Sequence, residues 1–281
     1  MKKTLSLVLA TSIGVSLGFS SPISAETNQF KESKQEIKQI DEVKNQGIKV
    51  NQNSDVAATE KLLEKMGFNL DEISKMPDGL KKEIVQSGGK KVTLNPVENS
   101  KRTSDTRIQY AISEPSLKVE NGLTFNLFAM FEGTEGLNNI YRLYSTGYWT
   151  EIPYLKTNDT IGLFWDSKIT PVKNENSARQ TWFDPDDQEA YLKADESSPY
   201  GVQWKSPFRN NASMFGTYTS QKVKVPTQYN GTNIEVGAAF MHPWLKQQQE
   251  ISLKFSPGTV EFNNVKGYLH TLKYKFNVGE K

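Results

Sequence analysis

Four carboxylates lie close together in the stretch WFDPDDQEAY, residues 182–191. They belong to Asp184, Asp186, Asp187 and Glu189. Carboxylate oxygens are the ligands that Ca²⁺ prefers, although this spacing lacks the central glycine of an EF-hand loop. Asp-Pro-Asp-Asp is also a turn sequence, because Asp side chains bond their own backbone and Pro fixes φ. The stretch therefore predicts a solvated turn, with a calcium site formed by these four residues or a catalytic carboxylate pair as alternatives.

Aromatic side chains beside turn signals are the candidates for ligand binding. Sugars have apolar C–H faces that stack on exposed rings, whereas rings that alternate with aliphatic residues fill a core. Trp165 and Trp204 follow the second pattern. The predicted ligand-binding residues are Tyr148, Trp149, Trp182, Tyr229 and Trp244, with His242 beside the last of them.

Catalytic chemistry has little support in the sequence. His270 falls on the apolar side of a predicted strand, where a core histidine is expected, and His242 alone makes no triad. No G-x-S-x-G, H-E-x-x-H or P-loop motif occurs. Glu235 and Asp166 are the strand-borne carboxylates that a glycosidase could use, although both fit solvent-facing positions.

The first 25 residues have the features of a secretory signal peptide. A short basic start, Met1-Lys2-Lys3, precedes an apolar run over 5–19 and the small residues of SSPISA, which end at Ala25. The run is short for a membrane span, which needs about 20 residues. No later segment is apolar enough to span a bilayer. We therefore expect a secreted protein, extracellular or associated with the cell wall.

Charge and cysteine content narrow the class further. Lys2 and Lys3 carry the whole formal charge of +2, so the chain from residue 26 has 34 − 2 = 32 basic and 32 acidic residues. Such a balance gives no electrostatic footprint for nucleic acid or for an anionic membrane, apart from any local basic patch that the fold assembles. The chain has no cysteine, which excludes disulfides and thiolate metal sites.

Composition divides the chain near Thr106, because all 5 Trp and all 11 Tyr follow that residue. Residues 26–56 are polar and are expected to be a disordered lead-in. Residues 57–88 have helical spacing of apolar residues, either Asn69 or Asp71 as a candidate N-cap, Asp78 near a further helix start, and Gly88-Gly89 at the end, which predicts a small helical hairpin. Residues 89–107 are expected to be a linker.

The segment LLEKMGFNLDEISKMPDGLKKEIVQSGGKKV, residues 62–92, resembles a helical segment of uncharacterised exported proteins from Gram-positive bacilli. The shared pattern is M-G-F, E-I, M-P, L-K, I and G-G. This resemblance implies export and no defined activity. It fits a structural helical cap, with a cleaved pro-region as the alternative.

Residues 108–281 alternate between apolar and polar positions, as in GLTFNLFAMF and YLHTLKYKFNV. Alternation of period two indicates antiparallel sheet with one face toward water. The predicted fold is mainly β: an antiparallel β-sandwich, jelly-roll or lectin-like, preceded by a short helical region. Asn230-Gly231 predicts a type I′ hairpin turn, and Pro257-Gly258 predicts another turn.

These observations favour a secreted, non-catalytic protein that binds a cell-surface or extracellular glycan or cell-wall polymer, with Ca²⁺ as the candidate cofactor. The first alternative is a polysaccharide hydrolase or lyase that uses carboxylates. The second is a membrane-active toxin, in which a long amphipathic hairpin over 211–240 would insert into a bilayer.

Overall fold

The structure is a computed structural model and describes residues 56–97, 118–120, 122–183, 187–210, 212, 214–244, 253–262 and 266–280. The predicted signal peptide, almost all of the lead-in and the linker from residue 98 on lie outside the described residues. No helix in the described ranges is long and apolar enough to cross a bilayer.

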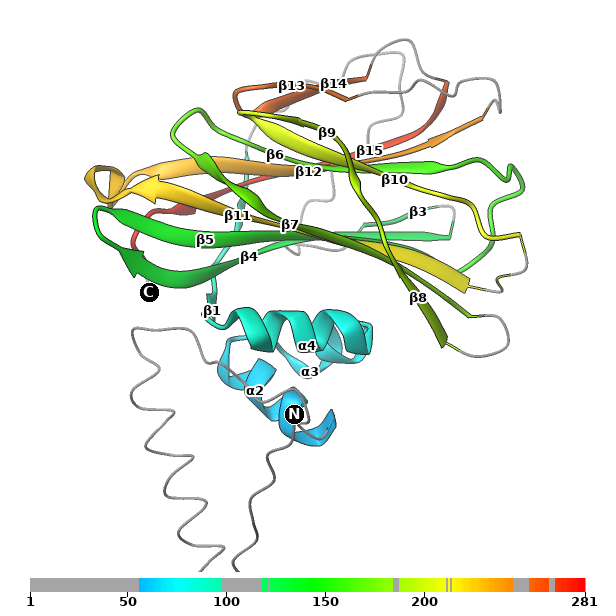
Figure 1. The fold of residues 1–281 in the computed structure, drawn as a ribbon, viewed down its shortest axis with the longest axis horizontal. Helices are drawn as coiled ribbons and strands as arrows, with labels where there is room; N and C mark the ends of the chain where they lie inside the picture. Colours follow the sequence, from blue (N-terminus) through cyan, green and yellow to red (C-terminus); the bar gives the residue numbers. More distant parts are fainter. Residues whose placement is uncertain are drawn as a thin grey trace, which may run out of the picture. The chain divides into compact units, whose positions relative to one another are not determined.

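Two antiparallel sheets form a sandwich, as the alternating pattern predicts (Figure 1). Sheet A has the order β1 (Lys90–Lys91), β4 (Leu123–Glu135), β5 (Asn138–Trp149), β11 (Met214–Pro226), β7 (Thr170–Phe183) and β8 (Asp187–Tyr191), with β3 (Lys118–Glu120) also paired to β4. Sheet B has the order β2 (Asn95–Pro96), β15 (Gly267–Asn277), β12 (Asn233–Pro243), β6 (Asp159–Trp165), β10 (Gly201–Ser206) and β9 (Ala194–Ser198).

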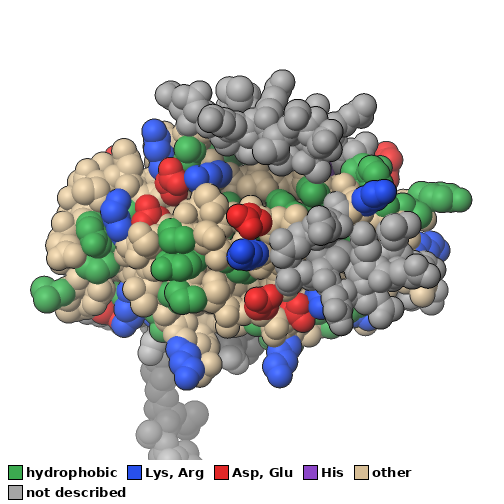
Figure 2. Space-filling view, turned by 90° about the horizontal axis from the view of Figure 1, so that it is seen from above, with side chains coloured by type: hydrophobic (Ala, Val, Ile, Leu, Met, Phe, Trp, Pro, Cys, Tyr) green, Lys and Arg blue, Asp and Glu red, His purple; other side chains and the backbone are tan. Residues whose placement is uncertain are grey.

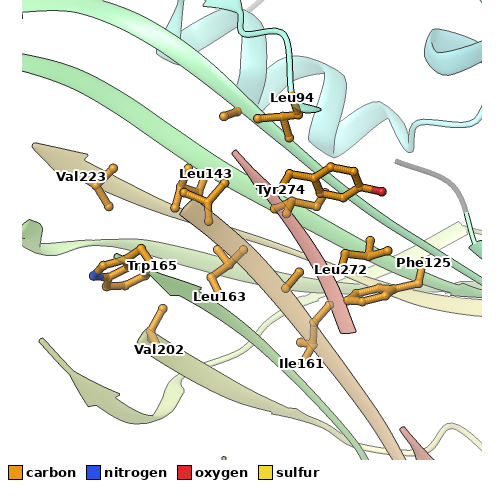
Figure 3. Packing of buried hydrophobic residues seen from close by; sticks show 14 of the residues in the cluster. Leu94, Phe125, Leu143, Ile161, Leu163, Trp165, Val202, Val223, Leu272 and Tyr274 are labelled. Atoms are coloured by element: carbon orange, nitrogen blue, oxygen red, sulfur yellow. The ribbon is translucent and has the colours of Figure 1, made fainter. Parts of the chain in front are cut away.

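The main core lies between the two sheets (Figure 3). Sheet A contributes Phe125 and Leu143, and sheet B contributes Ile161, Leu163 and other residues at alternate positions. Because successive side chains of a strand point to opposite faces, every second residue enters this layer. The predicted antiparallel β-sandwich with a preceding helical region is therefore confirmed.

Each sheet carries a cover on its outer face. A two-stranded hairpin, β13 (Leu253–Ser256) and β14 (Thr259–Phe262), packs on sheet B around Phe164 and Met241. Its two-residue turn is Pro257-Gly258, as predicted, with Gly258 at φ +64°. Three short helices, α2 (Val56–Lys65), α3 (Leu70–Ser74) and α4 (Asp78–Ser87), pack on sheet A.

The helices begin and end where local sequence signals place them. Asn69 caps α3 in a capping box with Glu72, which satisfies two backbone N–H groups. Gly88 ends α4 at φ +75°, a conformation that glycine adopts without a steric penalty. Apolar side chains on one side of the helices meet Phe128, Met130 and Tyr144 of the sheet.

The segment after the helices is not simply a linker. The basic residues Lys90 and Lys91 form β1 against β4, and Asn95-Pro96 forms β2 against β15 in the other sheet. Between them, Val92 and Leu94 are buried in the main core. Alternation over these few residues was hidden by the surrounding charge, so the predicted linker is corrected for residues 90–97.

The hairpin predicted at Asn230-Gly231 is also wrong. Strand β11 lies in sheet A and β12 in sheet B, so the two strands do not pair with each other. A short 3₁₀ helix, Thr227–Tyr229, joins them, and Asn230 has φ −52°, which a type I′ turn does not allow. The connection therefore crosses between sheets, and the hairpin over 211–240 that the toxin alternative needs is not formed.

Candidate functional site

A row of side chains crosses the outer face of sheet A from β5 to β8. The strand register places Tyr148 opposite Gly216, Gly216 opposite Thr181, and Thr181 opposite Glu189. The Tyr148 ring lies directly over Gly216, where any Cβ atom would overlap it. Its hydroxyl is 3.5 Å from Thr181 Oγ1. The missing side chain at Gly216 therefore lets the tyrosine ring lie along the sheet.

Arg179 lies at the centre of the next row along the strands, between Tyr218 and Tyr191. Its Nη1 donates to Glu189 Oε2 at 3.1 Å, and its guanidinium carbon is 4.4 Å from the centre of the Tyr191 ring. Glu83 of helix α4 also forms an ion pair with Arg179, with 3.9 Å between Arg179 Nε and Glu83 Oε2. Glu189 thus holds the guanidinium over the Tyr191 ring through a hydrogen bond, whereas Glu83 contributes a longer ion pair and Nε has no hydrogen-bond partner among the described residues.

Tyr218 connects this row with the acidic stretch. Its hydroxyl donates to Glu189 Oε1, and burial followed by this hydrogen bond raises the pKa of Tyr218. The phenol therefore remains a neutral donor at ordinary pH. Gly79 of α4 lies beside both side chains, where a Cβ atom would overlap them. The carboxylate of Glu189 is held by a phenol and a guanidinium together.

The outer part of this surface is open to solvent. Tyr191 is 73% exposed, and Phe183 and Met214, which are opposed on paired strands, are also exposed. We call the surface the hairpin face, because the β7–β8 hairpin supplies most of it. It consists of Tyr148, Arg179, Thr181, Phe183, Glu189, Tyr191 and Met214.

Helix α4 borders the hairpin face through Gly79, which lies beside Glu189, and through Glu83. The Glu83 carboxylate accepts hydrogen bonds from Ser220 at 2.7 Å and from Ser177 at 3.4 Å, besides lying near Arg179. All of these partners are on the outer face of sheet A. The helix therefore fixes one edge of the candidate site.

The structure describes only part of the acidic stretch, residues 182–191. Asp184 and Asp186 lie outside the described residues, as does the side chain of Asp187. Glu189 is on strand β8, with its carboxylate held by Arg179 and Tyr218. Within the part of the chain that the structure describes, no three acidic or histidine side chains gather as a metal site would require. The calcium prediction therefore remains a prediction.

Three predicted ligand-binding residues come together at one end of the sandwich. The centres of the Trp149 and His242 rings are 5.0 Å apart, and those of His242 and Tyr268 are 6.2 Å apart. Tyr268 in turn contacts Trp244 at 5.7 Å. Trp244 is 45% exposed, but Trp149 and His242 are buried. Their predicted place at a surface is corrected, because both side chains point inward from strand ends.

A buried carboxylate organises the inner part of this cluster. Asp159 Oδ2 accepts from Trp149 Nε1 at 2.8 Å, and its Oδ1 is 2.7 Å from His242 Nδ1. Burial raises the pKa of Asp159, and the contacts with His242 and Trp149 oppose that rise. His242 Nε2 is also buried and has no hydrogen-bond partner in the described part of the molecule. The pair resembles two members of a triad, but no substrate can reach it in this arrangement.

The remaining predicted residues lie apart from both groups. Trp182 points into the sandwich and packs under Arg209, whose guanidinium carbon is 4.0 Å from the centre of the ring. Tyr229 is half-buried in the 3₁₀ helix, with Lys168 over its ring at 5.8 Å. Neither ring offers a free face of the kind that the turn signals suggested.

The two carboxylates considered for a glycosidase are neighbours but are engaged by other groups. The Asp166 N–H donates to the backbone oxygen of Glu235 at 3.0 Å. The Glu235 side chain pairs with Lys273 at 2.7 Å, and the Asp166 side chain accepts from the backbone of Lys168 at 2.9 Å. These contacts are typical of strand-end ion pairs and turns.

The residues that the sequence analysis missed are Arg179, Tyr191, Asp159 and Tyr268. A signal for the first two was present, since Arg179, Thr181 and Phe183 alternate along one face of β7. Asp159 gave no signal, because its partner His242 is 83 residues away in the sequence. Figure 2 shows the opposite surface, above sheet B, where acidic and basic side chains are interspersed around hydrophobic ones.

Comparison with known proteins finds no matching family model and no matching curated protein. Among solved structures, the chain is similar to the collagen-binding subdomain of the Enterococcus faecalis surface protein ACE, at 8% identity and a TM-score of 0.31, covering 51% of this chain and 90% of that one. It is also similar to the RrgA Jo.In complex, at 10% identity and a TM-score of 0.36, covering 66% of this chain and 93% of that one. A third similar structure is the membrane-inserted form of the Clostridium perfringens NetB toxin, at 10% identity and a TM-score of 0.31, covering 57% of this chain and 93% of that one. We draw no conclusion about fold or function from likenesses this weak.

Proposed function

We propose that this is a secreted, non-catalytic binding protein that holds an extracellular glycan or cell-wall polymer on the hairpin face. The observation that carries the proposal is the exposed Tyr191 ring. One of its faces is covered by the Arg179 guanidinium, which Glu189 holds in place. The ring is 73% exposed in all, so it presents a fixed apolar surface to solvent.

The residue types around Tyr191 fit a carbohydrate. A sugar ring presents apolar C–H groups that stack on an aromatic ring, and hydroxyl groups that need donors and acceptors at its edge. Thr181 and the hydroxyl of Tyr148 lie in the neighbouring row of the same face. Phe183 and Met214 extend the exposed apolar surface along the strands. Such a flat site suits an extended polymer more than a small ligand.

The charges of the site favour a neutral glycan. Glu83 and Glu189 outnumber Arg179, which they already neutralise. An anionic polymer would meet unfavourable charge and would find no free cation among these residues. The ion pairs also argue against the hydrolase alternative at this face, because the carboxylates of Glu83 and Glu189 are both paired with Arg179.

Retention on immobilised polysaccharides and cell walls tests the proposal. We expect Tyr191→Ala to weaken retention about tenfold, because loss of one stacking ring costs roughly 1.5 kcal/mol. Leu137→Ala is the control, since Leu137 is 80% exposed at the turn between β4 and β5, outside the hairpin face. Equal retention of the Tyr191 variant and the unmodified protein would contradict the proposal.

The same columns test the predicted calcium site. If Asp184, Asp186, Asp187 and Glu189 bind Ca²⁺, EDTA will reduce retention and added Ca²⁺ will restore it. Because Glu189 is held by Arg179 and Tyr218, we expect Asp187→Asn to abolish the EDTA effect more completely than Glu189→Gln does. Retention that is insensitive to EDTA would contradict the calcium site.

A further inference from the structure

The loop between β5 and β6 carries two exposed apolar residues at its tip. Tyr154 is 97% exposed and Leu155 is 36% exposed, and they follow Pro153 and precede Lys156. Neither packs in a hydrophobic cluster of the described residues. Large apolar side chains that project singly are common on surfaces, but adjacent ones at a loop tip need a reason.

The rest of this loop is anchored, so the tip projects from a fixed base. At one end Thr150 donates to the backbone oxygen of Gly122 through both its N–H, at 2.7 Å, and its hydroxyl, at 2.9 Å. Ile152 packs against the main core. At the other end Thr157 Oγ1 donates to Pro243 O at 2.6 Å. The tip is therefore held outward by the fold.

Trp244 lies at the same end of the sandwich. It directly follows Pro243, the residue that Thr157 holds, and its N–H donates to Lys266 O at 2.9 Å. The ring is 45% exposed and rests edge-on against Tyr268. The end of the sandwich thus presents a tryptophan, a tyrosine and a leucine to solvent.

Basic side chains accompany these residues. Lys156 and Lys266 are exposed next to Leu155 and near Trp244, and Glu151 is the exposed carboxylate of the loop. Aromatic rings with a polar edge prefer the headgroup level of a bilayer, aliphatic side chains enter the acyl region, and lysines pair with lipid phosphates. The charge and the projecting shape suit a lipid surface more than a protein, whose hot spots fill pockets.

We propose that Tyr154, Leu155 and Trp244 form a membrane-contact tip that binds bilayers carrying anionic headgroups. Binding is peripheral and reversible, because three side chains bury less apolar surface than a stable anchor needs. The tip lies at an end of the sandwich and shares no residue with the hairpin face. Its success or failure is therefore independent of the proposed glycan binding.

Vesicle co-sedimentation of the chain from residue 26 tests the tip, with phosphatidylcholine alone and with phosphatidylcholine and phosphatidylglycerol in equal parts. We expect binding to the mixed vesicles and a fall of about tenfold or more in the partition coefficient of the Tyr154→Ser, Leu155→Ser double variant. Lys156→Gln should weaken binding about fivefold on the mixed vesicles alone. Leu137→Ser is the control, because Leu137 is 80% exposed at the turn between β4 and β5, at the opposite end of β5.

Three results would overturn the proposal. One is wild-type protein that stays in the supernatant with both kinds of vesicle. Another is a loss for Leu137→Ser equal to that of the double variant. The third is a double variant that binds vesicles normally but loses retention on glycans, which would make the loop part of a carbohydrate site. Because the changed residues are exposed, unfolding curves should coincide and confirm that each variant folds.

Discussion

Asp159 and His242 form a buried polar pair at one end of the β-sandwich. Asp159 and His242 come from adjacent strands, and Trp149 supplies a further donor from the other sheet. Breaking such a pair on one side costs about 3–5 kcal/mol, because the remaining charge stays buried without its partner. Loss of either side chain is therefore expected to lower the free energy of unfolding.

The pH dependence of this pair has a definite sign. Burial raises the pKa of Asp159 above its ordinary value of 3.8, so the folded protein binds this proton more tightly than the unfolded chain does. As pH rises through the window between the two values, the contribution of Asp159 to the free energy of unfolding falls. The contacts with His242 and Trp149 oppose the rise in the pKa of Asp159, so they stabilise the charged form of the carboxylate.

We predict that His242→Leu lowers the free energy of unfolding by about 3 kcal/mol at neutral pH, and by less at mildly acid pH where Asp159 can take up a proton. Urea denaturation at both pH values measures the two losses. Adding Asp159→Asn to the variant should remove most of this pH dependence. Losses that are equal at the two pH values would contradict a charged Asp159.

At the scale of elements, the helical segment and sheet A depend on one another. Helix α4 buries Leu80 and Ile84 against the aromatic residues of β4, β5 and β11, and Glu83 bonds to β11 and β7. The two central strands β5 and β11 are consequently buried on both faces. This arrangement supports the structural-cap interpretation of the helices, and it places their edge beside the hairpin face.

The helix contact can be tested with a matched pair of variants. We predict that Ile84→Ala lowers the free energy of unfolding by about 2–4 kcal/mol, because the deletion leaves a cavity in a fully buried site. Leu70→Ala removes a similar side chain from α3, where Leu70 is 68% exposed, and should change stability by less than about 0.5 kcal/mol. Similar losses for both variants in thermal or urea unfolding would argue against the docked helix.

At the scale of the molecule, we predict that helices and sandwich unfold in one transition. The cluster beneath the helices includes Phe128, Tyr144 and Tyr218 of the strands, so the helices cannot leave without exposing the sheet. All 5 Trp lie in the sandwich, and their fluorescence should follow the same curve as the helical circular dichroism signal. Loss of the helical signal at a lower urea concentration would indicate a separable helical region.

Local sequence patterns were sufficient to predict the fold class and the ends of the helices. Alternation of apolar residues fixes which side of a strand enters the core, as in β4, and a capping residue such as Asn69 acts on its immediate neighbours. These are local effects that a linear pattern records. Local reasoning failed where a turn signal stood between two sheets, since Asn230-Gly231 says nothing about the sheet to which each neighbouring strand belongs.

Contacts between residues that are distant in the sequence could not be predicted from local patterns. Glu189 and Arg179 are brought together by the register of β7 with β8, and Glu83 joins them from far away in sequence through the packing of α4. Asp159 and His242 meet because β6 and β12 are adjacent in sheet B. Convergence of this kind depends on strand order and register, which are set by the packing of the entire core and are not encoded in any short stretch of residues.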